Sequence, residues 1–319
     1  MRVTEGTNFN LIRDNIQRSR GRMEKLQGQT ATLKKLNTPS DDPVGAAKVL
    51  EVRTEKVNND QYQMNAKMAQ TFLNNSDHAL SELSEILVRA KEIALSQSSG
   101  ASSNDDTRIG VAEEVTQLFK QAVAAGNRRI GDRFLFGGYK TTTPPIDPEG
   151  KYVGDDGQMM VEIGNDVFIS VNVPGFEAFN TNPKRTPDLN GPYMHNRTPA
   201  SKDEAGPENV NVFDELQTLR INLLTGNIEG IRNTLERFDQ AHSNLVAMRA
   251  RVGSRIQGIQ STELSIDRHN LTNAALTSQL EDADMAQVVS DLAKEETVFK
   301  SSLASSQKLI QPTLMDFLK

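Results

Sequence analysis

Proline is distributed very unevenly along this chain. Pro39 and Pro43 come early, nine of the twelve prolines lie between Pro144 and Pro207, and Pro312 is last. Two long proline-free stretches remain, 44–143 and 208–311. Because a proline inside a helix costs about 3 kcal/mol, these stretches are where long helices can run. The chain is therefore predicted to be mainly α-helical, with an irregular middle.

Composition excludes several classes of function. The 319 residues carry a net charge of -6, which gives no electrostatic support for binding nucleic acid. No run of 18 apolar residues and no signal-peptide pattern occurs, so we expect no membrane partner and no cleaved signal. Cysteine is absent, which excludes disulfides and thiolate metal sites. Tryptophan is also absent and aromatics make up 5%, as expected for an elongated helical rod with narrow seams.

Alternating spacings of four and three residues predict a coiled-coil seam near each end of the chain. The first seam comprises Ile12, Ile16, Ser19, Met23, Leu26, Thr30 and Leu33. The second comprises Met285, Val289, Leu292, Glu296, Phe299, Leu303, Ser306 and Ile310. Each covers about four heptads, or about 40 Å of helix.

The polar seam positions leave two readings open. Such a pair is marginal by itself, so it could be poorly ordered in the free protein and become helical against neighbouring copies. An ordinary bundle within one chain fits the pattern equally well. Under the first reading the apolar seam residues form an assembly interface. That predicted interface is Ile12, Ile16, Met23, Leu26, Leu33, Met285, Val289, Leu292, Phe299, Leu303 and Ile310.

Longer helices are predicted between the two ends. Residues 44–97 carry the apolar positions Met68, Phe72, Ala79, Leu83, Ile86, Ala90 and Ile93, and a shorter helix follows with Val111, Val115, Leu118, Ala122 and Ala125. A helix over 209–224 is predicted to end at Gly226. The four-three spacing then runs through Ile231, Leu235, Phe238, His242, Leu245, Arg249, Val252, Ile256, Ile259, Glu263 and Ile266. This mirror order predicts that the chain doubles back, pairing short helix with short and long with long.

The stretch NTPSDDPVGAAK at 37–48 explains how the helices are separated. Pro39 stops one helix, while Asp42 suits the N-cap position and Pro43 the first position of the next. The sequence Glu281 to Asp284 supplies capping carboxylates at the matching place in the second half. Two aligned joints are therefore predicted.

The middle of the chain has a different residue pattern from the helical segments. Residues 159–163 and 167–173 are β-branched runs separated by Gly164-Asn-Asp166, which predicts a hairpin. The six prolines from Pro174 to Pro207 predict an irregular segment. We thus expect three domains: 1–38 with 282–319 (terminal coiled coil), 39–139 with 208–281 (long helices), and 140–207 (a small β-rich outer domain).

No residue pattern indicates catalysis, a cofactor or a metal. The histidines are far apart and are expected at surface or seam positions: His78, His195, His242 and His269. Adjacent carboxylates are expected to serve as caps and turns, and Asp155-Asp156-Gly157 lacks the spacing of a calcium loop. A short basic cluster is expected on a solvated helix face or in a packing contact: Arg128, Arg129 and Arg133.

Four stretches together resemble the type 3 hook-associated (hook-filament junction) members of the flagellin family. They are MRVTEGTNF at 1–9, NTPSDDPVGAAK at 37–48, RIGDRFLFGGYKTTTPPIDPEGKYVGDDG at 129–157 and MRARVGSRIQGIQ at 248–260. The resemblance touches both ends and the centre of the chain. It implies a flagellin-like architecture, with an inner coiled coil from the two ends, long helices next, and a variable β-rich outer domain.

The resemblance also implies a function. Such a protein is a structural subunit of the bacterial flagellum, exported by the flagellar type III apparatus without a cleaved signal peptide. Its implied partners are copies of itself in a ring or helical polymer, hook-associated protein type 1, flagellin, and a flagellar export chaperone. It would link hook-associated protein type 1 to the first flagellin subunits at the hook-filament junction.

Three alternatives stay open at this point. A flagellin that forms the filament itself shares the architecture, and the LFGGYK stretch and the proline-flanked SDDP favour the junction type. A cytosolic coiled-coil adaptor would bind partner helices without leaving the cell. A carboxylate-based hydrolase in the 140–207 segment would lose turnover in an Asp155→Asn variant.

Overall fold

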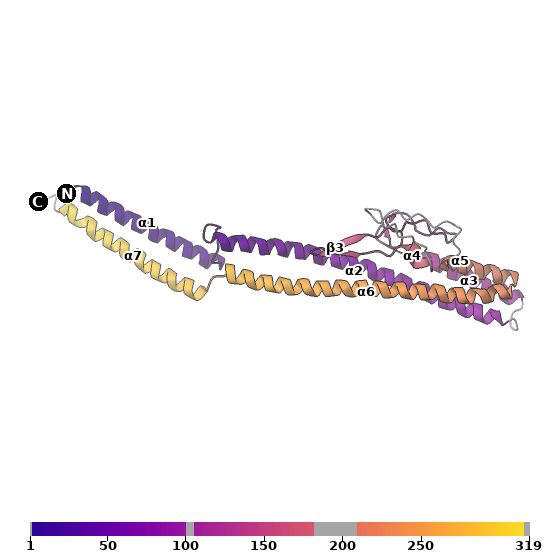
Figure 1. Cartoon of the computed structure of the whole chain (residues 1–319). Coiled ribbons are helices and arrows are strands. Elements are labelled where there is room, and N and C mark those ends of the chain that lie inside the picture. The colour runs from indigo at the N-terminus through magenta and orange to yellow at the C-terminus, as the bar shows by residue number, and fades with distance from the viewer. Residues whose placement is uncertain (1, 100–104, 182–208, 316–319) are drawn as a thin grey trace. The chain divides into compact units, whose positions relative to one another are not determined.

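The structure, a computed structural model, describes residues 2–99, 105–181 and 209–315 and is mainly helical (Figure 1). The helices in the described residues are α1 (Arg2–Thr32), α2 (Pro43–Ser98), α3 (Asp105–Gly126), α4 (Gly175–Phe179), α5 (Val212–Thr225), α6 (Ile228–Glu281) and α7 (Met285–Met315). The strands form two antiparallel hairpins, β1 (Arg129–Ile130) with β2 (Arg133–Phe134) and β3 (Met160–Gly164) with β4 (Val167–Ser170). The predicted mainly helical fold with a small β content is confirmed.

The chain forms two compact units. The first contains Met1–Asn59 and Asp267–Lys319, and the second contains Asp60–Ile266.

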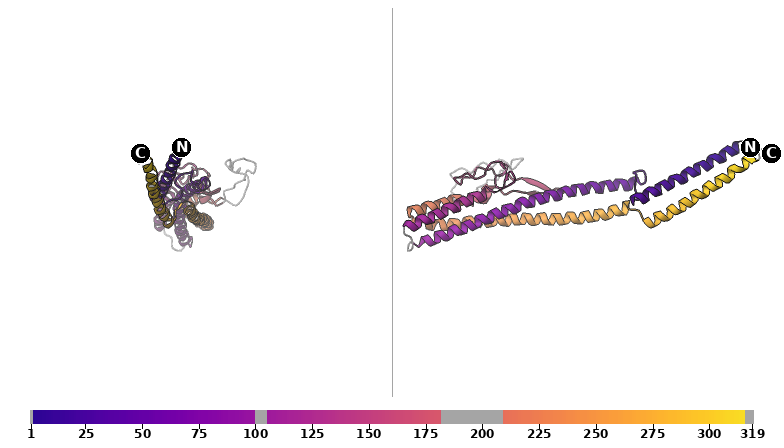
Figure 2. Two further views of the ribbon diagram at one scale, coloured as in Figure 1. Left: turned by 90° about the vertical axis from the view of Figure 1, so that its left-hand side faces the viewer. Right: turned by 180° about the vertical axis from the view of Figure 1, so that it is seen from behind.

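In the first unit, α1 and α7 lie side by side and antiparallel, so that the start of α1 lies beside the end of α7 (Figures 1 and 2). The predicted pairing of the two short segments is confirmed. The expectation that they lack order in the single chain is not what the structure shows, because both are helical and pair within it. In the same unit, Asn59 on α2 donates a hydrogen bond to Asn270 on α6 at 2.9 Å.

The two predicted helix breaks lie against each other in this unit. Lys35 N donates to the carbonyl of Glu281 at 2.6 Å, and Ala283 N donates to the carbonyl of Leu33 at 3.1 Å. The Glu281 carboxylate also accepts from Lys34 Nζ at 3.0 Å. These bonds make one joint out of two connections that are far apart in sequence.

Two aspartates at the joint, Asp42 and Asp284, cap the helices that follow them. Asp42 Oδ1 accepts from the N–H groups of Val44 and Gly45 at 3.1 and 3.0 Å, and α2 begins at Pro43. Asp284 Oδ1 accepts from the N–H groups two and three residues further on, at 3.0 and 3.3 Å. Each acceptor satisfies backbone donors that have no partner inside the helix.

Asp41 holds the loop between α1 and α2, in which Pro39 is exposed. Its Oδ2 accepts from the N–H of Thr38 at 3.1 Å, and its Oδ1 lies 2.8 Å from Lys25 Nζ. The bond to Lys25, followed by the bond to Thr38, lowers the pKa of Asp41 to about 2. This loop is therefore fixed by charge as well as by proline.

The second unit contains the main core. Ion pairs join its parts of α2 and α6, at 2.9 Å between Arg249 Nε and Asp77 and at 2.5 Å between Lys91 Nζ and Asp239. All eleven predicted seam positions of α6 from Ile231 to Ile266 are buried or half-buried. On α2, the predicted Met68 is exposed, because the buried stripe runs at the spacing of Ala66, Ala69, Leu73, Ser76, Leu80, Leu83, Leu87, Ala90 and Ala94.

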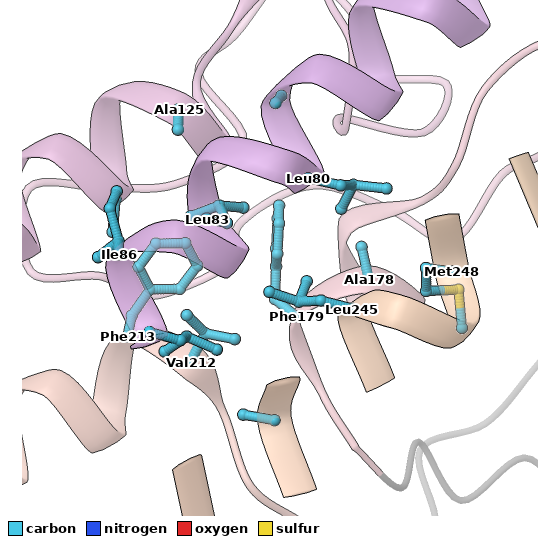
Figure 3. Packing of buried hydrophobic residues seen from close by; sticks show 14 of the residues in the cluster. Leu80, Leu83, Ile86, Ala125, Ala178, Phe179, Val212, Phe213, Leu245 and Met248 are labelled. Atoms are coloured by element: carbon cyan, nitrogen blue, oxygen red, sulfur yellow. The ribbon is translucent and has the colours of Figure 1, made fainter. Parts of the chain in front are cut away.

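Aromatic rings join the middle of the chain to this core. The Phe179 ring meets the rings of Phe136 and Phe213 edge-on, with centroids 5.1 and 5.2 Å apart. Figure 3 shows Phe179 and Phe213 among side chains of α2 and α6, including Leu83 and Leu245. Residues 135–179 and α5 are thus packed onto the helices by their largest apolar side chains.

The predicted hairpin of the middle segment is confirmed as β3 and β4. Val161 pairs with Ile169 and Glu162 with Phe168, and Asp166 takes a left-handed φ of 58° in the turn. The irregular segment predicted from Pro174 to Pro207 is wrong at its start, because Gly175–Phe179 form the short helix α4 directly after Pro174. Residues 182–208 of that segment lie outside the described residues. The segment that follows β4 is held on α6 by polar contacts.

One amide carries most of that attachment. Asn244 Nδ2 lies within hydrogen-bond distance of the carbonyl oxygens of Glu177, Ala178 and Asn180, at 3.2, 3.0 and 3.1 Å. Arg251 Nη1 pairs with the buried Glu177 carboxylate at 3.0 Å. Since α4 ends at Phe179, Asn244 serves acceptors that the helix itself cannot satisfy.

We predict that Asn244→Ala destabilises the second unit by about 1–3 kcal/mol, because buried carbonyl groups lose their donor. Urea denaturation followed by circular dichroism measures this loss, with Asn233→Ala, an exposed asparagine of the same helix, as the control. Equal stability of the two variants would contradict the assignment.

We also predict that the Asp41 contacts stabilise the joint only when the carboxylate is ionised. Its folded pKa of about 2 is below the ordinary value of 3.8, so the contribution is complete above about pH 4 and is lost as the pH falls through about 2. Carboxyl chemical shifts measured by NMR during an acid titration give the pKa directly. A midpoint near 3.8 would refute the contact, and Lys25→Ala is expected to raise the midpoint.

Candidate assembly interface

The α1 face of the terminal pair follows the predicted heptads. Ile12, Ile16, Met23 and Leu26 are half-buried, and Ser19 is 2% exposed. Ile12 and Ile16 line a groove of about 370 Å³ together with residues 297–306 of α7. These positions therefore face α7 in the single chain.

Leu33 departs from the predicted seam. It follows the last residue of α1, takes a left-handed φ of 60°, and is exposed. The reason is the joint, because the Leu33 carbonyl accepts from Ala283 N instead of continuing the helix. As a seam position of α1, the Leu33 prediction is wrong.

The α7 face is displaced from the predicted one. The residues turned inward are Val288, Leu292, Glu295, Phe299, Ser302 and Ser306, which keep spacings of four and three. The predicted Val289 and Leu303 are 51% and 39% exposed, whereas Glu296 is half-buried. Both patterns share Leu292, Phe299 and the buried Ser306, so sequence alone allowed either one. As seam positions within the chain, Val289 and Leu303 are wrong predictions.

The remaining two predicted α7 residues complete the picture. Met285 is half-buried at the start of the helix. The side chain of Ile310 lies outside the described residues.

A polar contact that the sequence pattern missed lies at the centre of the terminal pair. Glu295 Oε1 accepts from Ser19 Oγ at 2.7 Å and from Arg22 Nε at 3.1 Å. The bond from Ser19, followed by that from Arg22, lowers the pKa of Glu295. The signal that could have found it is Ser19 itself, because a polar residue in a predicted seam requires a partner across that seam.

The terminal pair leaves a second set of apolar side chains in solvent. Leu11 on α1 is 61% exposed, and on α7 Val289, Val298 and Leu303 are exposed. A helix pair buries one stripe of each helix, so these side chains keep 39–61% of their surface exposed, although Val298 also lines the groove with Ile12 and Ile16. Another molecule could bury them.

A second groove of the first unit has the same character. It holds about 820 Å³ between the start of α2 and the end of α6, with Val52, Leu271 and Ala274 in its lining. Leu271 is exposed, as are Leu50 and Val57, which are seven residues apart on α2. This groove adds to the apolar surface that the single chain does not cover.

The structure shows where most of the residues considered for metal binding or catalysis lie. His78 and His269 are exposed, His242 is half-buried, and His195 lies outside the described residues. Asp155 Oδ1 accepts from Gly157 N at 3.0 Å in a local turn and from Tyr139 N at 2.6 Å. No group of three metal-binding side chains occurs in the described ranges.

The basic cluster does not lie on a helix face. Arg129 and Arg133 are on the hairpin strands β1 and β2, and Arg128 Nη2 pairs with Glu82 Oε2 at 2.6 Å. The expected solvated helix face is therefore wrong, because α3 ends at Gly126, and the alternative of a packing contact describes Arg128. Across the residues that can be described, no helix is long and apolar enough to cross a membrane.

Several known flagellar proteins are similar to this chain in sequence. The profile of the bacterial flagellin N-terminal helical region matches residues 7–141. The flagellar hook-associated protein 3 of Escherichia coli K12 is 24% identical over 303 residues, which cover 90% of each chain. That of Salmonella typhimurium is 22% identical over 95% of each chain. A flagellin of Listeria monocytogenes is 22% identical over 88% of this chain and 86% of its own.

Solved structures show the same fold. A flagellar hook-associated protein of Vibrio parahaemolyticus superimposes with a TM-score of 0.63 at 19% identity, covering 76% of this chain and all of that one. The flagellar junction protein FlgL of Legionella pneumophila gives 0.55 at 17% identity, covering 74% and 100%. The helical fold, the matching N-terminal region and these homologues agree with the resemblance in the four sequence stretches. This chain is thus similar to proteins named flagellar hook-associated protein 3 along nine tenths of its length, and its residues 7–141 match the bacterial flagellin N-terminal helical region.

Proposed function

We propose that this protein is a structural subunit of the hook-filament junction, where it links hook-associated protein type 1 to flagellin. The observation that carries the proposal is the uncovered apolar surface of the terminal pair, with Leu11, Val289, Val298 and Leu303 in solvent. Its similarity to proteins named flagellar hook-associated protein 3 supports the hook-filament junction as the place of assembly. In this role the protein serves bacterial motility without catalysing a reaction.

The energetics favour polymerisation through these residues. Each Å² of apolar surface removed from water stabilises by about 25 cal/mol. Because α1 and α7 are already helical in the single chain, neighbouring copies would bury the outer apolar residues without ordering the whole backbone, which costs about 1–2 kcal/mol per residue. The predicted interface residues Val289 and Leu303 are available for this contact.

The finer parts of the proposal rest on the resemblance of the four sequence stretches to the flagellin family. The protein would bind a flagellar export chaperone and leave the cell through the flagellar type III apparatus without a cleaved signal peptide. The ends 1–38 and 282–319 would form the inner domain of the assembly, residues 39–139 with 208–281 the next, and 140–207 the outer one. The aligned joint at 33–42 and 281–284 supports a boundary at that place.

A filament-forming flagellin is the second candidate. The similarity to Listeria flagellin over 282 residues supports it. The two candidates differ in amount and position, because a filament subunit is present along the whole filament and a junction subunit only at its base. A cytosolic adaptor or a hydrolase of the 140–207 segment has no comparable support.

Deletion of the gene separates these functions. We expect hooks without filaments and flagellin monomers in the medium, because filament subunits would lack their attachment. Electron microscopy of cells and immunoblots of the medium give the result. Normal filaments in the deletion strain would exclude the junction role, and filament loss without released flagellin would favour the filament subunit.

Complementation tests the surface itself. We expect Val289→Glu with Leu303→Glu to restore no filaments while the protein is still secreted, because the added charges prevent burial between copies. The matched control is Val153→Glu with Val167→Glu, which places the same two charges at exposed valines of the second unit. If the α7 variant restores filaments as well as the control does, these residues are not in the interface.

A further inference from the structure

The seam between α1 and α7 contains one acidic side chain that is mostly withdrawn from water. The Glu295 side chain is 15% exposed, and its Oε1 lies 2.7 Å from Ser19 Oγ and 3.0 Å from Arg22 Nη2. Both of these donors come from α1, and Ser19 is itself buried. The neighbouring seam positions of α7, Leu292 and Phe299, are apolar.

A carboxylate in this position is tolerated only with its donors. Removing a charge from water costs several kcal/mol unless charged or polar partners compensate. If α1 were displaced by one heptad in either direction, Leu26 or Ile12 would replace Ser19 opposite Glu295. Neither side chain can donate a hydrogen bond, and Asn15 or Gln29 would replace Arg22, so the displaced pairings leave the carboxylate without a cationic partner.

Pairing between two copies of α7 meets a different obstacle. Val288, Leu292 and Phe299 would form an adequate apolar seam for two such helices. In a parallel pair in register, however, Glu295 of one copy would face the same carboxylate of the other. Like charges at a coiled-coil core oppose association, whereas polar core residues with partners define which helices pair.

We propose that Ser19, Arg22 and Glu295 are specificity determinants that commit α7 to α1, in the antiparallel register seen here, and disfavour pairing of α7 with α7 of another copy. This selection would matter wherever many copies meet at high local concentration. The proposal concerns which helices pair and not where the protein assembles. An experiment can therefore contradict it without contradicting the junction role, and the reverse is also true.

A charge exchange in the full-length protein tests the pairing. Because the chain has no cysteine, Ile16→Cys with Val298→Cys, two residues that line one groove between the helices, reports the α1–α7 pair as an intramolecular disulfide. We expect Arg22→Glu and Glu295→Arg each to lower the yield of this disulfide severalfold. The two changes together should restore it.

Non-reducing gels after mild oxidation separate the intramolecular product from dimers. Single variants that cross-link like the parent, or a double variant no better than the worse single one, would overturn the proposal. Circular dichroism of each variant shows whether helix content is kept, so that a general loss of structure is recognised.

A second measurement addresses pairing between copies. With Ser302→Cys as the reporter on the inward face of α7, we expect Glu295→Leu to increase disulfide-linked dimers about tenfold, since the opposing charges are removed. The control Glu296→Leu adds the same side chain at the adjacent position, where the native side chain is 45% exposed, compared with 15% for Glu295. Equal dimer yields in the two variants would show that hydrophobicity alone, and not the seam carboxylate, governs association.

Discussion

Two helices in contact can bury only one stripe of each, and this limit governs the first unit of the protein. The inner stripe of α1 is covered by α7, and the outer residues of both helices are left to solvent. Leu11 and Val289 are exposed for this geometric reason. A structural subunit can use the same limit, because the uncovered stripe is available to another molecule.

In the second unit, additional elements cover more than one stripe of the long helices. Residues from 135 to 179 and helix α5 pack onto α2 and α6, and the rings of Phe136, Phe179 and Phe213 close the space between them. Tyr152 donates its hydroxyl to the carbonyl of Phe136 at 2.8 Å, and burial raises the pKa of that hydroxyl. This unit holds a continuous core of its own, in contrast to the seams of the first.

Polar residues within the seams of the first unit are paired across them. Asn59 meets Asn270, and Glu295 meets Ser19. Such pairs add little net stability compared with apolar residues of the same size, but an unsatisfied member is costly. Their effect is to exclude other pairings. Narrow helical seams need this more than a thick core does, because their apolar residues are few and interchangeable.

Several features depend on local chemistry and were predicted from the sequence alone. The absence of proline from 44–143 permits long helices, Asp42 and Asp284 cap the helices that follow them, and Gly226 ends α5 with a left-handed φ of 68°. The mirror order of the seams predicted the antiparallel pairing of the two ends. These signals act within a few residues or through a regular period.

Tertiary structure decided the features that depend on contacts between distant residues. Stripes through Val288 and Glu295 or through Val289 and Glu296 share Leu292 and Phe299, and only the donors Ser19 and Arg22 on α1 distinguish them. Asn244 acquires its role from carbonyl groups more than 60 residues earlier in the chain. Periodicity shows that a helix has an inner face, but where neighbouring stripes are nearly equal in apolar content, the partner across the seam selects between them.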